Sequence, residues 1–187
     1  MNIDVIELYI HELGSCMNVE RMYITRSNHK RKTHKLLLKY NSLPYECYEE
    51  KYTILEEMFE SIGEKVSIGH SFICDYGCNI SIGNNVLIAP NVQIYTAPHP
   101  IELDERLTLV ETEKGTEYIR HTYALPVTIE DGCWIGGGAI ILPGVTIEQG
   151  SVIGVGSVVS KSIPVNSLAV GNPCKVIRKI NIPCNHD

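Results

Sequence analysis

An aliphatic residue recurs at every sixth position between residues 127 and 159, and this spacing constrains the fold more than any other feature. Residues spaced by six would scatter around the circumference of an α-helix, so the pattern is not helical. It is typical of a left-handed parallel β-helix, in which three hexads close one triangular coil and the aliphatic side chains stack inside. The series consists of Ile129, Ile135, Ile141, Ile147, Ile153 and Val159.

A second series follows the first at a distance of four residues, and its members are small or apolar. Much of the remaining sequence is glycine or another turn-forming residue. Glycine and asparagine suit the corners of a triangular coil because they tolerate a positive φ. The fold predicted from these two series is therefore mainly β, a parallel β-helix. The second series is Cys133, Ala139, Val145, Ser151 and Ser157.

The same six-residue step appears earlier in the chain, with one offset of two residues. We predict a bulge near Ile80 to Ile82, where the offset falls. The pattern stops at Tyr95 and returns at Val127, so residues 96–126 are predicted to leave the coil as a long loop of the functional or mobile kind. The earlier inward positions are Ile62, Ile68, Cys74, Ile80, Ile82, Ile88 and Ile94, with Val66, Phe72, Val86 and Val92 as the second series.

The first sixty residues have a helical texture. Val5 to Leu13 could form a short amphipathic helix, and Glu49 to Ile62 is predicted to be helical with an apolar stripe. The basic segment from Arg26 to Lys39 could attract an anion, although a solvated helix face is the more usual explanation. The stripe consists of Ile54, Leu55, Met58, Phe59 and Ile62.

These patterns divide the chain into three parts. Residues 1–60 are predicted to form a helical cap, because the end of a solenoid must cover its exposed core and strand edges. Residues 61–165 form the β-helix, with the excursion 96–126. Residues 166–187 form a C-terminal strap with a basic ending.

Composition narrows the class of protein. A net charge of −6 argues against nucleic acid as a main partner. The longest uncharged stretch is interrupted by glycines and a proline, and the N-terminus lacks a basic region before an apolar core, so we expect neither a membrane span nor a secretory signal. The seven cysteines include no CxxC motif. We therefore expect the cysteines to be reduced thiols, which indicates a cytoplasmic location.

Four motifs, in order, suggest a family: CDYGCNISIG (74–83), IAPNVQIYTAPHP (88–100), WIGGGAIILPGVTI (134–147) and AVGNPCKVIRKI (169–180). Together with YNSLP and EEMFESIG, they closely resemble the maltose/galactoside O-acetyltransferases of the hexapeptide-repeat superfamily. The resemblance covers residues 36–180. It implies a homotrimer that binds acetyl-CoA between neighbouring subunits and transfers acetyl to a hydroxyl of a sugar or similar small molecule, with no metal expected.

Within this resemblance, His99 is the candidate general base. It lies where the coil pattern stops, in Tyr95-Thr-Ala-Pro-His-Pro100. A sugar hydroxyl is a weak nucleophile, and a neutral imidazole can remove its proton during attack on a thioester. The sequence contains no nucleophile elbow or Cys–His motif that would suggest an acyl-enzyme. The competing interpretation is a turn histidine without catalytic function. The other histidines are expected to be structural or to lie on the surface.

The resemblance also implies binding positions, matched one at a time. Gly137, Val155 and the pair Ser160 and Lys161 match positions along the pantetheine arm of acetyl-CoA. Asp75 matches a position that lines the acceptor side. Two further matches lie near the nucleotide phosphates, namely Lys175 and Arg178, and Lys175 stands where the family has arginine.

One departure from the family affects the site directly. Relatives usually carry about twenty more residues, close to one coil of hexads, between the equivalents of Ile82-Gly83 and residues 85–88. That segment holds an asparagine that assists the catalytic histidine and an aspartate that contacts the acceptor. The excursion after His99 is in turn longer than usual. Possible substitutes for the asparagine are Asn79, Asn84, Asn85 and Asn91.

Two alternative functions therefore remain open at the level of sequence. The chain could be a non-catalytic trimeric scaffold or an acyl-CoA-binding relic that lost turnover together with the missing coil. It could also be a zinc enzyme on the same fold, which would need three histidines from adjacent coils. Only His70 and His99 come from coil segments, so the zinc reading has little support.

Overall fold

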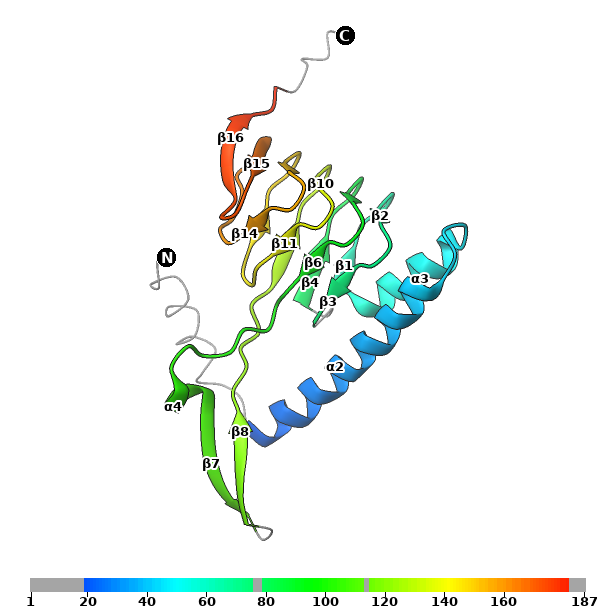
Figure 1. Cartoon of the computed structure of the whole chain (residues 1–187). Helices are drawn as coiled ribbons and strands as arrows, with labels where there is room; N and C mark the ends of the chain where they lie inside the picture. Colours follow the sequence, from blue (N-terminus) through cyan, green and yellow to red (C-terminus); the bar gives the residue numbers. More distant parts are fainter. Residues whose placement is uncertain (1–18, 76–78, 113–114, 182–187) are drawn as a thin grey trace.

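The computed structural model describes residues 19–75, 79–112 and 115–181. Figure 1 shows short strands stacked in a coil, with two helices at one end and a hairpin projecting from the side. The strands form three parallel sheets, which make the three faces of the coil. The parallel β-helix predicted from the six-residue period is confirmed.

Each face collects one strand from every coil. The first face contains β1 (Ser61–Ile62), β4 (Ile80–Ile82), β9 (Val127–Ile129) and β12 (Thr146–Ile147). The second face contains β2 (Ser67–Ile68), β5 (Leu87–Ile88), β10 (Trp134–Ile135), β13 (Val152–Ile153), β15 (Ser167–Val170) and the antiparallel edge strand β16 (Lys175–Lys179). The third face contains β3 (Ile73–Cys74), β6 (Gln93–Ile94), β11 (Ile140–Ile141) and β14 (Val158–Val159).

The core follows the predicted register. Ile141 pairs with Ile94 on one side and with Val159 on the other, so equivalent side chains stack from coil to coil. All six aliphatic residues of the hexad series are at most 1% exposed, and the second series is buried as well. Because the strands alternate between outward and inward side chains, each short strand contributes one residue to this column.

The predicted bulge at Ile80 to Ile82 is wrong. Strand β4 pairs with β9 without a register shift, and Ile82 lies opposite Ile62. The two residues by which this coil exceeds three hexads fall instead between Cys74, which ends β3, and Ile80, which begins β4. Ile80 and Ile82 are both buried because side chains two residues apart in a strand point the same way. Both positions therefore fit a step of six, and the sequence could not tell which one continued the series.

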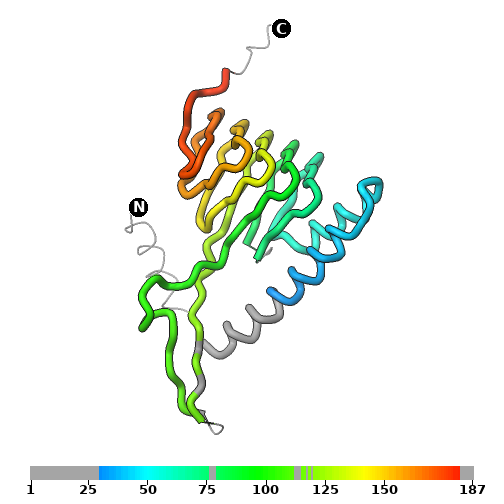
Figure 2. The backbone as a smooth tube through the Cα atoms, viewed as in Figure 1, coloured from blue at the N-terminus to red at the C-terminus, as the bar shows by residue number. Residues whose placement is uncertain are grey.

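Two helices, α2 (Val19–Ser42) and α3 (Tyr48–Met58), cover the end of the first coil (Figure 2). The hydroxyl of Tyr40 donates to the carbonyl of Ile68 at 2.6 Å, and the amide of Asn41 donates to the carbonyl of Phe72 at 2.8 Å. Among the described residues, no strand pairs with the outer edge of β1, β2 or β3, so helix side chains satisfy part of that edge.

The helix predicted for Glu49 to Ile62 ends earlier than expected. Helix α3 stops at Met58, where Phe59 is extended and its N–H makes the last bond, to Leu55. Ile62 belongs to β1, because pairing with Ile82 begins the first coil there. In the described part of the basic segment of α2, the exposed side chains include Lys30, Arg31, Lys32, His34, Lys35 and Lys39, as expected of a solvated helix face. The short helix predicted for Val5 to Leu13 lies outside the described residues.

The excursion is more ordered than the predicted long loop. It contains the short helix α4 (Leu103–Arg106) and an antiparallel hairpin of β7 (Leu107–Thr112) and β8 (Gly115–Arg120). The hairpin projects away from the coil (Figures 1 and 2). The hairpin does not pack on the coil, so its strands lack the alternation that a strand shows when one of its faces is buried.

Stacking continues beyond the hexad series at the C-terminal end. Ile163 forms a bridge with Ile147, and Ala169 in β15 pairs with Ile153 and is fully buried. The core thus extends into the segment predicted as a strap. Strand β16 then turns back along β15 and is exposed throughout. Within the described part of the chain, no helix has the length and apolar character needed to cross a membrane.

Two buried acidic groups predict how stability depends on pH. Burial, with a smaller effect from Tyr45, raises the pKa of Tyr40 to about 12. Burial also raises the pKa of the Cys133 thiol to about 11, with bonds from the backbone at Ser151 opposing the shift. Unfolding releases both groups to ionise at their ordinary values of 10.0 and 9.0. Both pKa values are higher in the folded state, so the stabilisation is complete below pH 9 and is lost as pH rises toward 12.

Chemical denaturation between pH 7 and 11.5 tests this expectation. The free energy of unfolding should fall more steeply above pH 10 in the wild type than in Tyr40→Phe, which has no phenol to ionise. Tyr40→Phe should start lower at pH 7, because it loses the bond to Ile68. Parallel curves above pH 10 would contradict the assignment to Tyr40.

Candidate active site

His99 lies where the chain leaves the coil. After β6 the backbone continues outward through Thr96 instead of turning into the first face, and the returning segment runs beside it. Leu125 N–H donates to the carbonyl of Thr96 at 2.8 Å, and Tyr123 N–H donates to the carbonyl of Pro98 at 2.9 Å. His99 therefore stands at the end of a short ladder that begins at the rigid coil.

The hydrogen bonds of His99 determine its tautomer. Its Nδ1 atom lies 2.6 Å from the carbonyl oxygen of His121, and a carbonyl oxygen can only accept. Nδ1 therefore carries the proton, and in the neutral ring Nε2 keeps the lone pair. The hydroxyl of Thr122 lies 3.2 Å from the same Nδ1. The His99 side chain is exposed, so a base with a defined orientation is accessible from solvent.

The carbonyl that orients His99 belongs to the base of the β7–β8 hairpin. His121 N–H donates to the carbonyl of Arg106 at 3.0 Å, and the His121 ring lies 2.8 Å from the hydroxyl of Thr108. From the sequence His121 was expected to be structural or on the surface, and its part in orienting His99 was missed. A main-chain carbonyl has no residue signature, so the only available signal was the unusual length of the excursion.

Asp75 lies beside the same exit. Its carboxylate accepts hydrogen bonds from the N–H of Thr96 at 2.9 Å, from the Thr96 hydroxyl at 3.0 Å and from the N–H of Ala97 at 3.1 Å. Both carboxylate oxygens are therefore engaged with the departing chain. Contact between Asp75 and an acceptor stays a prediction.

The residues matched to acetyl-CoA occupy two edges of the third face. Gly137 and Val155 lie in successive coils at the corner after the second face, where Gly156 N–H donates to the carbonyl of Gly137 at 2.9 Å. Val155 is 80% exposed. Ser160 and Lys161 follow β14 at the corner after the third face, and both are exposed. The chain leaves toward His99 from that second edge, two coils earlier.

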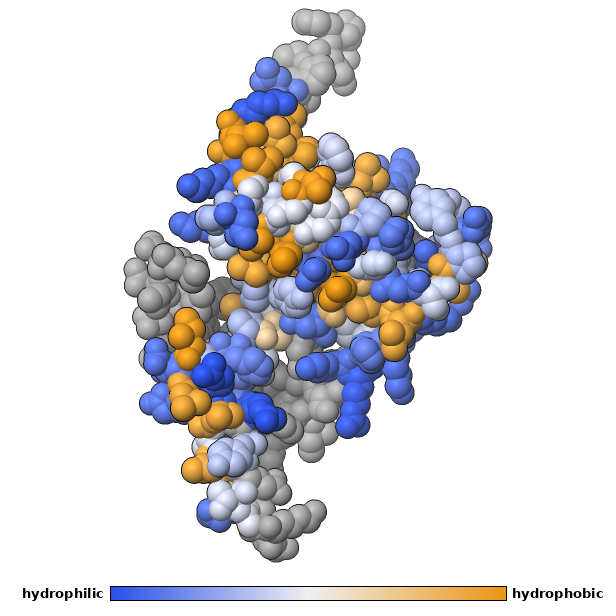
Figure 3. All heavy atoms as spheres, viewed as in Figure 1, coloured by the Kyte–Doolittle hydropathy of each residue, from blue (hydrophilic) through white to orange (hydrophobic). Residues whose placement is uncertain are grey.

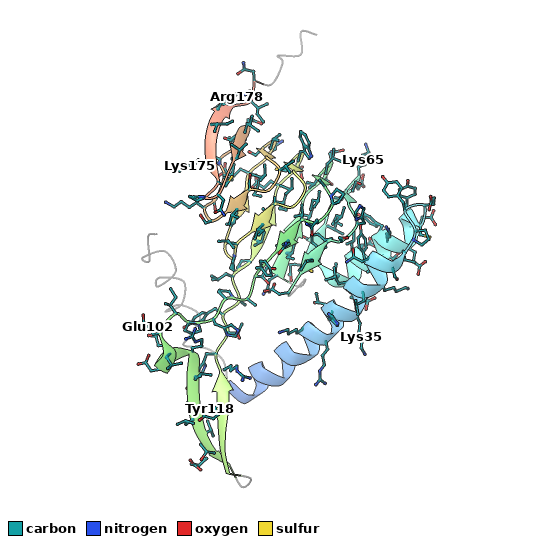
Figure 4. All side chains as sticks on the ribbon, viewed as in Figure 1. Lys35, Lys65, Glu102, Tyr118, Lys175 and Arg178 are labelled. Carbon is teal, nitrogen blue, oxygen red and sulfur yellow. The ribbon has the colours of Figure 1, made fainter. Side chains whose placement is uncertain are left out.

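Two matched cations lie farther along the coil. Figure 4 shows Lys175 and Arg178 on β16, at the opposite end of the coil from Lys65. Both side chains are exposed. The structure thus groups His99 with Asp75 and distributes the remaining matched residues over two edges and one end of the coil. Their predicted role in binding acetyl-CoA stays a prediction.

The backbone passes close to its neighbours at the Gly136–Gly137 corner. A Cβ atom at Gly136 would lie 2.6 Å from the nitrogen of Val155, and one at Gly137 would lie 3.2 Å from the oxygen of Pro90. Glycine at 136 is therefore required by coil packing. At Gly137 the constraint is weaker, and the position can offer a ligand only its backbone.

The four asparagines that could replace the missing one lie at different corners of the coil. Asn84 is used at the first corner, where it bonds Glu64 and Asp131, and its neighbour Asn85 adopts a φ of 56° there. Asn91 adopts a φ of 61° at the second corner. Asn79 alone lies in the corner after the third face, one coil before the exit to His99.

Metal ligation has no obvious site in the described part of the chain. No group of three or more His, Cys, Asp or Glu residues there is arranged to hold a metal ion. His70 is exposed in a first-coil corner, where its Nδ1 lies 3.2 Å from the hydroxyl of Ser71.

Comparison with known proteins supplies independent information. Residues 126–161 match the model of the bacterial transferase hexapeptide (six repeats). The chain is 43% identical over 164 residues to YJL218W of Saccharomyces cerevisiae, which is provisionally named an acetyltransferase, and the alignment covers 77% of this chain and 78% of the yeast protein.

Similar solved structures include two acetyltransferases. A maltose O-acetyltransferase from Clostridium difficile 630 shares 40% identity and a TM-score of 0.65, with 84% of this chain and 89% of that chain covered. A galactoside acetyltransferase in complex with coenzyme A shares 34% identity and a TM-score of 0.64, with 83% and 82% covered.

The yeast alignment also bears on the missing coil. Covering 77% of 187 residues corresponds to about 144 residues, so about 20 of the 164 aligned positions face a gap in this chain. This total is close to the length of one coil. The corner between β4 and β5 is closed in this chain, where Ile82 and Ile88 are six residues apart and both are buried.

The tautomer of His99 can be measured directly. In protein labelled with ¹⁵N and held above pH 8, the His99 ring should give the nitrogen shifts of an Nδ1–H tautomer, because the His121 carbonyl fixes that proton. His70 serves as the internal control, since a hydroxyl beside its Nδ1 permits the Nε2–H form that free imidazoles prefer. An Nε2–H form at His99 would contradict the geometry.

Proposed function

The chain belongs to the hexapeptide-repeat family that includes the maltose and galactoside O-acetyltransferases, and we propose that it transfers acetyl from acetyl-CoA to a hydroxyl of a sugar or similar small molecule. Membership in this family makes the protein an acetyltransferase. The observation that supports the hydroxyl acceptor most directly is the orientation of His99, whose Nδ1 is bonded to a carbonyl.

The proposed reaction needs one base and no covalent enzyme intermediate. Nε2 of His99 takes the proton of the acceptor hydroxyl as its oxygen attacks the thioester carbonyl. The tetrahedral intermediate then collapses, the C–S bond breaks, and the imidazolium returns the proton to the departing thiolate. The bond from Nδ1–H to His121 keeps the ring oriented in both steps. General-base help of this kind contributes roughly 10²–10⁴-fold.

We propose that acetyl-CoA lies along the third face. Gly137 and Val155 would approach the pantetheine arm from one edge, with Ser160 and Lys161 on the other. The exposure of Val155, Ser160 and Lys161, and the position of Gly137 and Val155 in successive coils, support this arrangement. The phosphates would then reach the cations of β16, where Arg178 can make a forked contact. Lys175 would contribute charge without that geometry.

A homotrimer would complete the site. The residues matched to acetyl-CoA and the exit to His99 occupy different edges of one chain, so a cleft between neighbouring subunits could combine them. Leu87 and Trp134 are adjacent on the outer side of the second face and are 53% and 52% exposed. Exposed apolar neighbours often mark an interface. Figure 3 shows further hydrophobic side chains over α4 and β7 and near β15 and β16.

An acyl-CoA-binding relic is the second candidate. The family resemblance favours it, because the segment that carries the family asparagine and aspartate has no counterpart between Gly83 and Asn85 in this sequence. Such a protein would bind acetyl-CoA without turnover. Asn79 is the described asparagine placed at the corner where a substitute could act.

A cytoplasmic location is also proposed, on the basis of cysteine usage. Four cysteines in the described residues, Cys47, Cys74, Cys133 and Cys174, are free thiols. Cys74 and Cys133 are buried and pack as small apolar side chains.

Acetyl-CoA turnover, followed by release of the CoA thiol, tests the catalytic assignment. On a panel of sugars and amino sugars, His99→Ala should lower kcat by about 100-fold or more, because the base is lost. His70→Ala is the matched control, since it removes an exposed histidine from a first-coil corner, and it should retain full turnover. Equal rates for wild type and His99→Ala would refute the role of His99. Binding of acetyl-CoA without turnover in the wild type would favour the relic.

The oligomeric state tests the composite site. Leu87→Glu should convert a trimer into monomers in sedimentation velocity and abolish turnover, because a charge would enter an apolar interface. Leu38→Glu is the matched control, since Leu38 is 60% exposed on α2, and it should remain trimeric. A wild-type monomer at micromolar concentration would contradict the composite site.

A further inference from the structure

We propose that Asp75 is a positioning residue for His99, acting through the departing backbone rather than through contact with the acceptor. The inference rests on the proposed function, because it takes His99 as the base. It changes the expected role of Asp75 from substrate recognition to fixing the geometry of catalysis.

The Asp75 carboxylate accepts hydrogen bonds from the backbone where the chain leaves the coil. Cys74 pairs with Ile94, so Asp75 lies next to the point where the following coil opens at Thr96. Thr96 is fully buried, and its N–H and hydroxyl both need acceptors there. One oxygen of Asp75 accepts from both groups, at 2.9 and 3.0 Å, and the other accepts from Ala97 N–H at 3.1 Å.

A continuous set of hydrogen bonds connects this contact to the imidazole. Thr96 accepts from Leu125 through its carbonyl, and Pro98 accepts from Tyr123 in the same way. His99 then donates to the carbonyl of His121 at 2.6 Å. The strand that Asp75 holds is therefore paired with the strand that orients the ring. If Thr96 and Ala97 shift, the pairing shifts with them, and the ring moves relative to its acceptor.

Charge and geometry favour this role. Bonds from backbone N–H groups to a carboxylate are charge-assisted and stronger than neutral ones. Two such bonds come from the consecutive residues Thr96 and Ala97, and the Thr96 hydroxyl adds a third bond to the same carboxylate, a short distance along the chain from His99. Catalytic groups need support to within about half an ångström. A half-buried carboxylate that accepts three hydrogen bonds at the start of the excursion can supply that support.

The first arm of the test measures kinetics. Asp75→Asn keeps the size of the side chain but places an amide donor against backbone donors, so kcat should fall about 100-fold, the cost typical of a catalytic group displaced by about 1 Å. KM for both substrates should stay at the wild-type value. Thr96→Val removes the hydroxyl donor to Asp75 and keeps both backbone donors, so kcat should fall about fivefold. A raised acceptor KM with unchanged kcat would overturn the proposal in favour of acceptor binding.

The second arm is a double-mutant cycle. If Asp75 acts only through His99, Asp75→Asn should cause no further loss in the His99→Ala background. Losses that multiply would show that Asp75 acts independently of the base, and they would overturn the proposal.

The third arm requires no turnover. The ¹⁵N shifts of the His99 ring should change from a single Nδ1–H tautomer in the wild type to a mixture in Asp75→Asn. Thr96→Val should show the same change to a smaller extent, and it carries the test if Asp75→Asn does not fold. An unchanged ring in the folded variants would overturn the proposal. A wild type without turnover would refute the proposed function, whereas the ring measurement would still decide the role of Asp75.

Discussion

The pairing register between successive coils is the constraint on which the rest of the molecule depends. Ile141 lies between Ile94 and Val159, and a slip of one residue would turn each of these side chains out of the core. Because each coil contacts only its neighbours, the register is set locally and repeated. A chain can therefore lack a whole coil and keep a sound core, while groups that the absent coil would have carried to the surface are lost.

The proposed active site is built partly on this rigid coil and partly on the segment that leaves it. His99 is not on the coil, yet it lies close to where the chain leaves it. The bond between Asp75 and Thr96 fixes the start of the departing strand, and the bond from His99 to His121 fixes its end. The excursion, which has no counterpart in the repeat, thereby supplies part of the proposed active site instead of merely covering it.

The sequence predicted the structure where the type of a side chain depends on the backbone around it, and failed where the same side chain fits two backbones. The buried columns were predictable because the aliphatic spacing directly reflects the register. The end of α3 was not, since Phe59 is buried whether the backbone is helical or extended. The position of the extra residues before Ile80 was ambiguous for a similar reason. His99 was identified by its motif, whereas the contribution of His121 is made by a carbonyl that every residue possesses.

The two ends of the coil are closed in different ways, and this difference has a consequence for assembly. At the first coil, Tyr40 and Asn41 occupy backbone groups of the edge. At the last, β16 runs antiparallel and carries Lys175 and Arg178 outward. A parallel stack with two open ends would be a template for addition of further copies, as in a fibril. The helices at the first coil and the reversed, positively charged strand β16 at the last coil both make such end-to-end addition less favourable.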